Sequence, residues 1–246
     1  MFKLPVYFTS DNHFSMEIDD SEKKRRSKLY KVFDQIKSTG GTLVIGGDFF
    51  DFWFQYKYVV PSGYIDLLEQ LSSLQSSGVQ IHFIFGNHDF WDFGFFTKKF
   101  GAKVYPNNLD MIIENKKIQV CHGDGLIKND YGYRFMKKII RSSLCISLFK
   151  AFHPDWGCKL AKVISKTSGD YHHHDLKSDS IRKEMIEYAR SQWALGVNVV
   201  LLGHYHQTGI IEENGNKLIF MGDWIRYFTI TRLDTNGWWQ GKWDEL

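Results

Sequence analysis

Seven side chains that can bind a metal ion follow runs of β-branched or aromatic residues: Asp11, His13, Asp48, Asn87, His122, His204 and His206. Their donors are oxygen and nitrogen atoms without sulfur. Such a set suits two divalent ions of the Mn²⁺, Fe²⁺ or Zn²⁺ kind better than a structural zinc, which prefers thiolates. A carboxylate such as Asp48 can bridge the pair. Two ions about 3.5–4 Å apart activate a bridging water and clamp a phosphoryl group during in-line attack, so the pattern favours phosphoester hydrolysis.

The block Gly86-Asn87-His88-Asp89 adds two groups that can take part in proton transfer. An imidazole titrates near neutral pH, and a neighbouring carboxylate can hold its orientation. We therefore predict that His88 and Asp89 are catalytic. His88 would donate a proton to the leaving group, and Asp89 would orient the imidazole.

The segments before these blocks have the composition of buried strands. Strands are expected at residues 4–9, 42–45, 79–85, 118–121, 197–202, 218–221 and 227–233. Helical periodicity occurs between the earlier strands, at about residues 22–37 and 64–74, and this alternation indicates an α/β fold. The last two strands are close in sequence and suggest added antiparallel pairing. Because an open α/β sheet builds its ligand crevice at the strand ends, the fold would bring the blocks together.

The composition is that of one globular domain. A chain of 246 residues with 43% hydrophobic and 24% charged residues is long enough for one α/β core and too short for two comfortable ones. We therefore treat residues 1–246 as a single domain. The three cysteines have no paired spacing, which favours a reducing compartment. The sequence lacks a signal-like stretch and any run near ~20 apolar residues, so we expect a cytoplasmic protein.

One segment differs from the rest of the chain. Residues 130–168 approximate a basic amphipathic helix that breaks near Pro154, and we predict a helical cap at residues 126–170, inserted between two core strands. Between Tyr131 and Lys166, eight basic residues accompany a single acid. The cap would thus attract an anionic lipid head, and its aliphatic bias favours lipid over nucleic acid. The alternative is a helix pair packed on the core with a solvated basic face.

The blocks read Asp-x-His, Gly-Asp, Gly-Asn-His-Asp, His-Gly-Asp and Gly-His-x-His in order across residues 11–206. This order resembles the calcineurin-like metallophosphoesterase superfamily. The resemblance implies a four-layer α-β-β-α sandwich, with helices outside two packed mixed sheets. It also implies two sets of metal ligands that share Asp48. Asp11, His13, Asp48 and His206 would hold the first ion, and Asp48, Asn87, His122 and His204 the second.

Two stretches, residues 47–53 and 122–133, make the chain similar to the UDP-2,3-diacylglucosamine diphosphatase family of lipid A biosynthesis. In that family a cap receives the acyl chains, and the core cleaves a pyrophosphate to give UMP and 2,3-diacylglucosamine 1-phosphate. The resemblance implies a lipid-nucleotide substrate, two ions (Mn²⁺ first, Fe²⁺ or Zn²⁺ otherwise) and a cytoplasmic protein peripherally associated with the inner membrane. The substrate-binding residues that it implies are Asn87, Asp130, Tyr133 and Ser165.

His88 departs from that family, which tends to carry Gly-Asn-Arg-Asp. An arginine suffices when phosphate leaves, because phosphate is already a good leaving group, whereas an alkoxide needs a proton. The alternative hypothesis is therefore a metal-dependent phosphodiesterase or phosphomonoesterase with another substrate. A third hypothesis is a non-enzymatic module that binds a membrane surface or a partner through the basic cap. The sequence makes no prediction of the oligomeric state.

Overall fold

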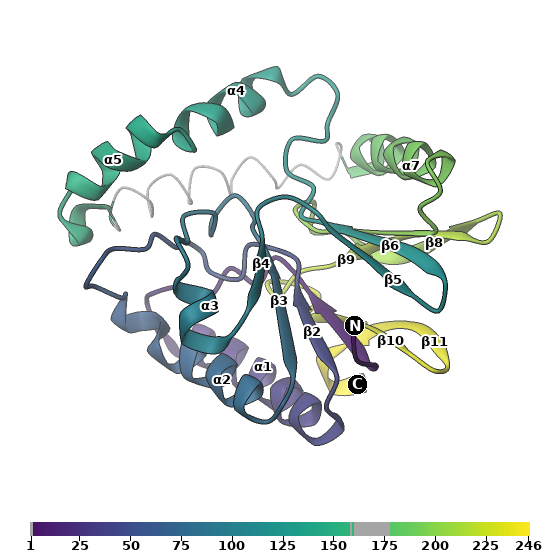
Figure 1. The fold of residues 1–246 in the computed structure, drawn as a ribbon, viewed down its shortest axis with the longest axis horizontal. Coiled ribbons are helices and arrows are strands. Elements are labelled where there is room, and N and C mark those ends of the chain that lie inside the picture. Colours follow the sequence, from purple (N-terminus) through teal and green to yellow (C-terminus); the bar gives the residue numbers. More distant parts are fainter. Residues whose placement is uncertain (1, 158, 160–177) are drawn as a thin grey trace.

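The computed structural model describes residues 2–157, 159 and 178–246. In this part of the chain the strands form two sheets, and helices lie on both outer faces (Figure 1). The architecture is therefore the α-β-β-α sandwich that the family resemblance implies.

The first sheet is six-stranded in the described chain. In sheet order its strands are β11 (Gly237–Lys242), β10 (Thr229–Asp234), β1 (Val6–Thr9), β2 (Thr42–Ile45), β3 (Gln80–Ile84) and β4 (Lys103–Tyr105). The strands from β1 to β4 pair in parallel, whereas β10 and β11 extend the β1 edge in antiparallel register. β1 and β2 are buried along their whole length because both faces of the sheet are covered.

The second sheet is five-stranded in the same described residues. Its order is β5 (Leu109–Ile113), β6 (Lys116–Cys121), β7 (Val199–Leu202), β9 (Asn216–Met221) and β8 (Thr208–Glu213). β6, β7 and β9 are parallel, and two antiparallel hairpins, β5 with β6 and β8 with β9, form the edges.

Helices cover the outer faces. α1 (Asp20–Thr39), α2 (Ile65–Ser76) and α3 (Phe95–Phe100) lie against the first sheet, and α7 (Ser178–Ala194) lies against the second. α1 begins after Asp19, whose carboxylate accepts a hydrogen bond from the Glu22 N–H at 2.7 Å, and it ends at Gly40. Short 3₁₀ turns occupy Ser62–Tyr64 and Trp243–Glu245.

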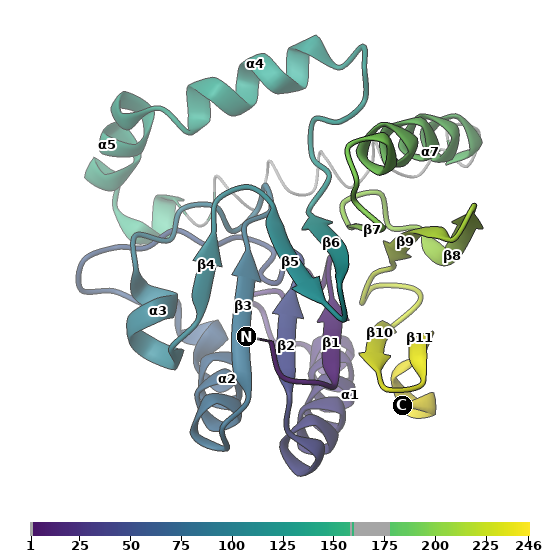
Figure 2. The ribbon, with the colours of Figure 1, turned by 45° about the vertical axis from the view of Figure 1, so that its right-hand side comes forward.

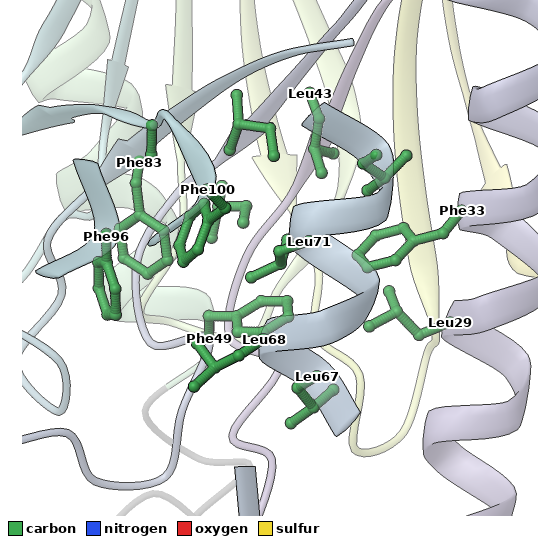
Figure 3. Close-up of a cluster of buried hydrophobic side chains, with 14 of the residues drawn as sticks. Leu29, Phe33, Leu43, Phe49, Leu67, Leu68, Leu71, Phe83, Phe96 and Phe100 are labelled. Atoms are coloured by element: carbon green, nitrogen blue, oxygen red, sulfur yellow. The ribbon is translucent and has the colours of Figure 1, made fainter. Parts of the chain in front are cut away.

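Three hydrophobic cores separate the layers. Figure 3 shows side chains of the first, where α1 and α2 meet β2 and β3; it labels Leu29, Phe33, Leu43, Phe49, Leu67, Leu68, Leu71, Phe83, Phe96 and Phe100. Between the two sheets, Phe8 and Val44 pack with Val120 and Leu201. Under α7, Met185 packs against the second sheet. Each sheet is thus buried on two sides, which gives the strand ends a rigid base.

The two late strands lie in different sheets. The expected antiparallel pairing exists, but β9 makes it with β8, and β10 makes it with β1 and β11. The connection between β9 and β10 passes from the second sheet to the first, and within it Trp224 donates its main-chain N–H to the Asp11 carbonyl oxygen at 3.1 Å. Closeness in sequence therefore does not mean pairing here.

The predicted cap region begins with two helices outside the four layers. α4 (Tyr131–Ile140) and α5 (Ser143–Ala151) arch over one end of the sandwich (Figures 1 and 2), and neither contains a buried residue. The Phe149 ring lies 4.6 Å from that of Phe54 and touches the core there. The bounds 126–170 stay a prediction because residues 158 and 160–177 lie outside the described part. No described helix combines the length and the apolar character that spanning a membrane requires.

Arg26 joins α1 to α2 and to the loop after β1. Its side chain is 2% exposed, and its guanidinium lies 2.9 Å from Glu22 Oε1 and 2.6 Å from Asp66 Oδ1. It also donates to the carbonyl oxygen of Ser15. A buried cation paired in this way is costly to break, because its partner carboxylate stays in the interior.

Replacing Arg26 by alanine would remove the buried guanidinium that pairs with Glu22 and Asp66 and would leave the Glu22 carboxylate with Arg25 as its cation partner. We expect the free energy of unfolding to fall by ~3–5 kcal/mol, as measured by urea denaturation. The matched control is Lys23→Ala on the same helix, which removes an exposed pair with Asp20 and should cost less than ~1 kcal/mol. Similar losses in the two variants would show that Arg26 is not an anchor.

Candidate active site

The strand ends that carry the predicted ligands meet at one edge of the sandwich. β1, β2 and β3 run in parallel in one sheet, and β6 and β7 run in parallel in the other. Their carboxyl ends point toward the side over which α4 arches (Figure 2). Loops from both sheets thus deliver their side chains to one place.

The buried carboxylate of Asp48 lies at the centre of these loops. Its Oδ2 is 3.2 Å from His122 Nε2 and 3.7 Å from His13 Nε2. Its Oδ1 accepts a hydrogen bond from the main-chain N–H of His88 at 2.8 Å. One carboxylate therefore contacts donors that come from both sheets.

The structure brings all seven predicted ligands together. In two groups, one donor atom of each residue lies within 4.8 Å of the others: Asp11, His13 and His206 in the first, and Asp48, His122 and His204 in the second. Asn87 extends the second group, since its Oδ1 is 3.1 Å from His122 Nε2. We call these seven residues the ligand cluster. A further group joins His13 and His88 with Asp51, which sequence reasoning missed.

Most of the ligand cluster has left-handed backbone conformations. The φ angles are +52° at Asp11, +44° at His13, +53° at Asp48, +66° at His204 and +52° at His206. Non-glycine residues rarely adopt this conformation, and holding one in it costs ~1–3 kcal/mol. Strain of this kind persists only where the surrounding structure imposes it, and it concentrates at functional sites.

Two glycines allow the loops to approach one another. A Cβ on Gly86 would collide with Asp48 Oδ1, and a Cβ on Gly47 would lie 2.6 Å from His122 Nδ1. The Gly47 φ of +97° also favours glycine. Any larger residue at these positions would displace the Asp48 carboxylate or the His122 ring.

The charges of the cluster favour a bound cation. Burial alone would lower the pKa of His122, but the carboxylates of Asp48, Asp11 and Asp124 together outweigh burial and raise it to about 10. His122 Nδ1 is 3.0 Å from the Gly46 carbonyl oxygen, and because a carbonyl only accepts, Nδ1 carries a proton. Without a metal, a protonated Nε2 neutralises Asp48. A divalent ion can replace that proton and bind the Nε2 lone pair.

His88 is oriented by a main-chain group and not by Asp89. Its Nδ1 lies 2.6 Å from the Asp51 carbonyl oxygen, so Nδ1 donates and Nε2 is the second nitrogen of the ring. The fully buried Asp89 instead accepts the main-chain N–H groups of Gly86 and Phe49, at 2.8 and 2.7 Å. The structure thus differs from the sequence prediction: Asp89 secures the loop, and the loop places His88.

Comparison with known proteins supports a family assignment. A model of the family described as calcineurin-like phosphoesterase matches residues 4–208. The chain belongs to this family. Over 238 residues it is 30% identical to a Porphyromonas gingivalis protein named UDP-2,3-diacylglucosamine hydrolase, which covers 90% of this chain and 91% of that protein. A Haemophilus influenzae protein of the same name is 28% identical over 238 residues, or 94% and 95% of the two chains. A solved archaeal phosphodiesterase shares 14% identity and a TM-score of 0.47 over 96% of this chain and 98% of its own.

As a calcineurin-like phosphoesterase, the chain is a metal-dependent hydrolase and not a non-enzymatic binding module. The family uses a dinuclear divalent metal centre, and the ligand cluster fits one. Its donors are oxygen and nitrogen atoms, which suit Mn²⁺, Fe²⁺ and Zn²⁺. The donors form two groups, and Asp48 contacts His13 of the first as well as His122 of the second.

Asp223 orients His206, and sequence reasoning missed it. Asp223 Oδ2 lies 3.2 Å from His206 Nδ1, and Oδ1 accepts the main-chain N–H groups of Ile225 and Arg226 at 2.9 and 2.7 Å. A carboxylate in this position fixes the tautomer and direction of a metal-binding imidazole. The signal was present, since Gly222-Asp223 directly follows β9 as Gly47-Asp48 follows β2.

Two of the predicted substrate-binding residues, Asp130 and Tyr133, lie at the amino end of α4, and Asn87 lies in the ligand cluster. Asp130 caps this helix and accepts the Tyr133 N–H at 3.1 Å. The Tyr133 hydroxyl donates to Asp124 at 3.0 Å, and its ring centre lies 6.1 Å from that of His204 in the ligand cluster. Ser165 lies outside the described residues.

Replacing Asp223 by asparagine should weaken metal binding. Asparagine keeps an acceptor for the loop but loses the charge that holds His206, so we expect a ~10–100-fold lower metal affinity. Competition with a chromogenic chelator measures it. The control Asp20→Asn removes a carboxylate whose side chain is 90% exposed and should leave the affinity unchanged. An Asp223 variant within threefold of the wild type would contradict the orienting role.

Proposed function

We propose that this calcineurin-like phosphoesterase hydrolyses the pyrophosphate of UDP-2,3-diacylglucosamine to UMP and 2,3-diacylglucosamine 1-phosphate. The observation that carries the proposal is the orientation of α4 beside the ligand cluster. Lys137 and Arg141 turn inward to Asp124, whereas most of the large apolar residues of α4 are exposed to solvent. The exposed apolar residues of the region are Tyr131, Phe135, Met136, Ile139, Leu144, Leu148, Phe152 and Trp156.

This orientation is the reverse of a helix that packs its apolar face on the core and exposes its basic face. Cations directed to the reaction centre suit a diphosphate, and apolar groups on the outside suit acyl chains. The Porphyromonas and Haemophilus relatives that carry the name of this activity match nearly the whole chain. Both observations support a lipid-nucleotide substrate.

The ligand cluster would hold two divalent ions, with Mn²⁺ as the first candidate. Asp11, His13, Asp48 and His206 are the proposed ligands of one ion, and Asp48, Asn87, His122 and His204 those of the other. When bound, two such ions lower the pKa of a water between them and neutralise charge on the phosphoryl oxygens.

The chain's own groups position the substrate and handle its charge. Asn87 and His88 are half-buried, and the His88 ring centre lies 4.7 Å from that of His13 in the ligand cluster. A protonated His88 can stabilise the departing phosphate, as an arginine would. Asp89 acts indirectly by holding their loop. We propose that Asp130 and Tyr133 contact the sugar-phosphate part of the ligand. Ser165 is proposed to bind substrate on the family resemblance alone.

The exposed apolar residues of α4 and α5 would also meet the inner membrane from its cytoplasmic side. A surface that combines apolar residues with cations binds anionic membranes without spanning them. We therefore propose peripheral association, which would bring the active site to a substrate that is itself embedded in the membrane.

The direct test is the release of UMP. Protein loaded with Mn²⁺ should convert UDP-2,3-diacylglucosamine to UMP and the lipid phosphate in equal amounts, as measured by chromatography. Asp48→Ala should slow this by ~10²-fold or more, because the shared ligand is lost. A preparation that cleaves bis(4-nitrophenyl) phosphate but releases no UMP would refute the substrate assignment.

A second candidate function is favoured by the fixed orientation of His88. Because Nδ1 donates to the Asp51 carbonyl oxygen, Nε2 can exchange a proton with a leaving group. Such a donor is needed for alkoxides and not for phosphate. A phosphodiesterase or phosphomonoesterase with an alkoxide leaving group is therefore the alternative.

His88→Arg separates the two functions. A proton-donor role predicts that hydrolysis of alkyl esters falls ~10²–10⁴-fold while 4-nitrophenyl esters are spared. The diphosphatase proposal predicts that UMP release stays within about tenfold of the wild type, because arginine can also stabilise a leaving phosphate. Steady-state kinetics on the three substrates decide. Equal losses on good and poor leaving groups would rule out proton donation.

A further inference from the structure

Asp124 attaches α4 to the core. This carboxylate follows β6 in the His122-Gly123-Asp124 block, and its side chain is 7% exposed. It lies 2.5 Å from Lys137 Nζ and 3.6 Å from Arg141 Nη2, and it accepts the Tyr133 hydroxyl. Residues 133, 137 and 141 are spaced four apart and therefore lie on one face of α4 and its C-cap. All three contact the Asp124 carboxylate, which connects this face to the core.

Arg141 is fixed against the loop that carries Asn87 and His88. Its Nη2 donates to the Gly86 carbonyl oxygen at 3.2 Å, and its guanidinium lies 3.8 Å from the centre of the Phe90 ring. The side chain is 15% exposed. Because Gly86 and Phe90 already hold the Arg141 guanidinium in place, it loses little conformational freedom when an anion binds. The guanidinium is therefore preorganised.

A basic cavity borders this guanidinium. Its volume is about 360 Å³, within the range of ~300–1,000 Å³ that small-molecule sites occupy. It is lined by Asp124, Gly125, Arg134, Lys137, Lys138 and Arg141. Four cations against one carboxylate leave a net positive lining that favours an anion. The planar fork of arginine matches two oxygens of one phosphoryl group.

We propose that Arg141 binds the phosphoryl group that is not attacked, so that α4 and not position 88 supplies the guanidinium that recognises a diphosphate. This assignment deepens the proposed function and rests on it. It makes Arg141 a specificity residue: a ligand with two linked phosphoryl groups gains from it, whereas a simple ester at the ligand cluster does not. It also accounts for a histidine at position 88 in a site that accepts a diphosphate.

The test compares two nucleotides that differ by one phosphoryl group. Metal-loaded protein is titrated calorimetrically with UMP and with α,β-methylene-UDP, which cannot be hydrolysed at the bridge. Arg141→Gln should raise the Kd of α,β-methylene-UDP ~10–100-fold and that of UMP less than ~threefold. Arg141→Lys keeps the positive charge but loses the planar guanidinium that can donate to two oxygens, so its Kd for α,β-methylene-UDP should lie between those of the wild type and Arg141→Gln. It also decides the question if the glutamine variant does not fold.

Lys150→Gln is the matched control. Lys150 is another cation of this region that lies over a phenylalanine, 4.0 Å from the Phe93 ring centre, but it is exposed and does not line the cavity. Its variant should bind both nucleotides as the wild type does. If Arg141→Gln weakens both nucleotides equally, or weakens neither, the assignment is wrong.

Steady-state kinetics distinguish a failure of the Arg141 assignment from a failure of the proposed function. For UDP-2,3-diacylglucosamine, kcat/KM should fall ~10–100-fold in Arg141→Gln, while hydrolysis of bis(4-nitrophenyl) phosphate stays within ~threefold. A wild type that releases no UMP would overturn the proposed function, and the nucleotide titrations would still decide the role of Arg141. A wild type that releases UMP, with an Arg141 variant that binds α,β-methylene-UDP normally, would overturn the role of Arg141 alone.

Discussion

The site depends on one buried carboxylate. Asp48 contacts His13 from the β1 loop, His122 from the β6 loop and the His88 N–H from the β3 loop, and so connects the two sheets. A carboxylate in the interior is unfavourable unless cations and hydrogen-bond donors surround it. The imidazoles meet this need in the protein alone, and divalent ions meet it when bound. The buried Asp48 carboxylate therefore needs nearby positive charge, and this same need favours the binding of divalent ions at the site.

The fold supplies the rigidity that this arrangement needs. Most of the ligand cluster has positive φ angles, a conformation that isolated loops would leave. Both sheets are buried between further layers, so the strand ends cannot relax. Arg25 adds to this from α1, because its Nε donates to the Trp224 carbonyl oxygen at 3.1 Å and its Nη2 to that of Asn12. Core packing therefore helps to hold the loops of the active site in their strained conformations.

Much of the site was predictable because its residues follow strands in recognisable blocks. The α/β class followed from the alternation of strands and helices, the four layers followed from the family resemblance, and the seven predicted ligands lie together. The contacts that the sequence did not predict join residues distant along the chain. The Asp51 carbonyl that orients His88 has no side-chain signal, and the inward direction of Arg141 depends on Asp124, which lies before the helix. Pairing of β9 and β10 with other partners likewise follows from the path of the loop between them.

The cap region and the ligand cluster meet at Asp124 and the loop after β3, so the charges that recognise a substrate and those that hold metal are neighbours. The central proposal is that Asp48 would serve as a ligand of both metal ions. Electron paramagnetic resonance of the protein titrated with Mn²⁺ tests it most directly. The structure predicts two bound ions per chain and, at full loading, the spectrum of a magnetically coupled pair. Saturation with one ion, or two ions with the uncoupled spectrum of isolated Mn²⁺, would contradict the proposal that Asp48 is a ligand of both ions.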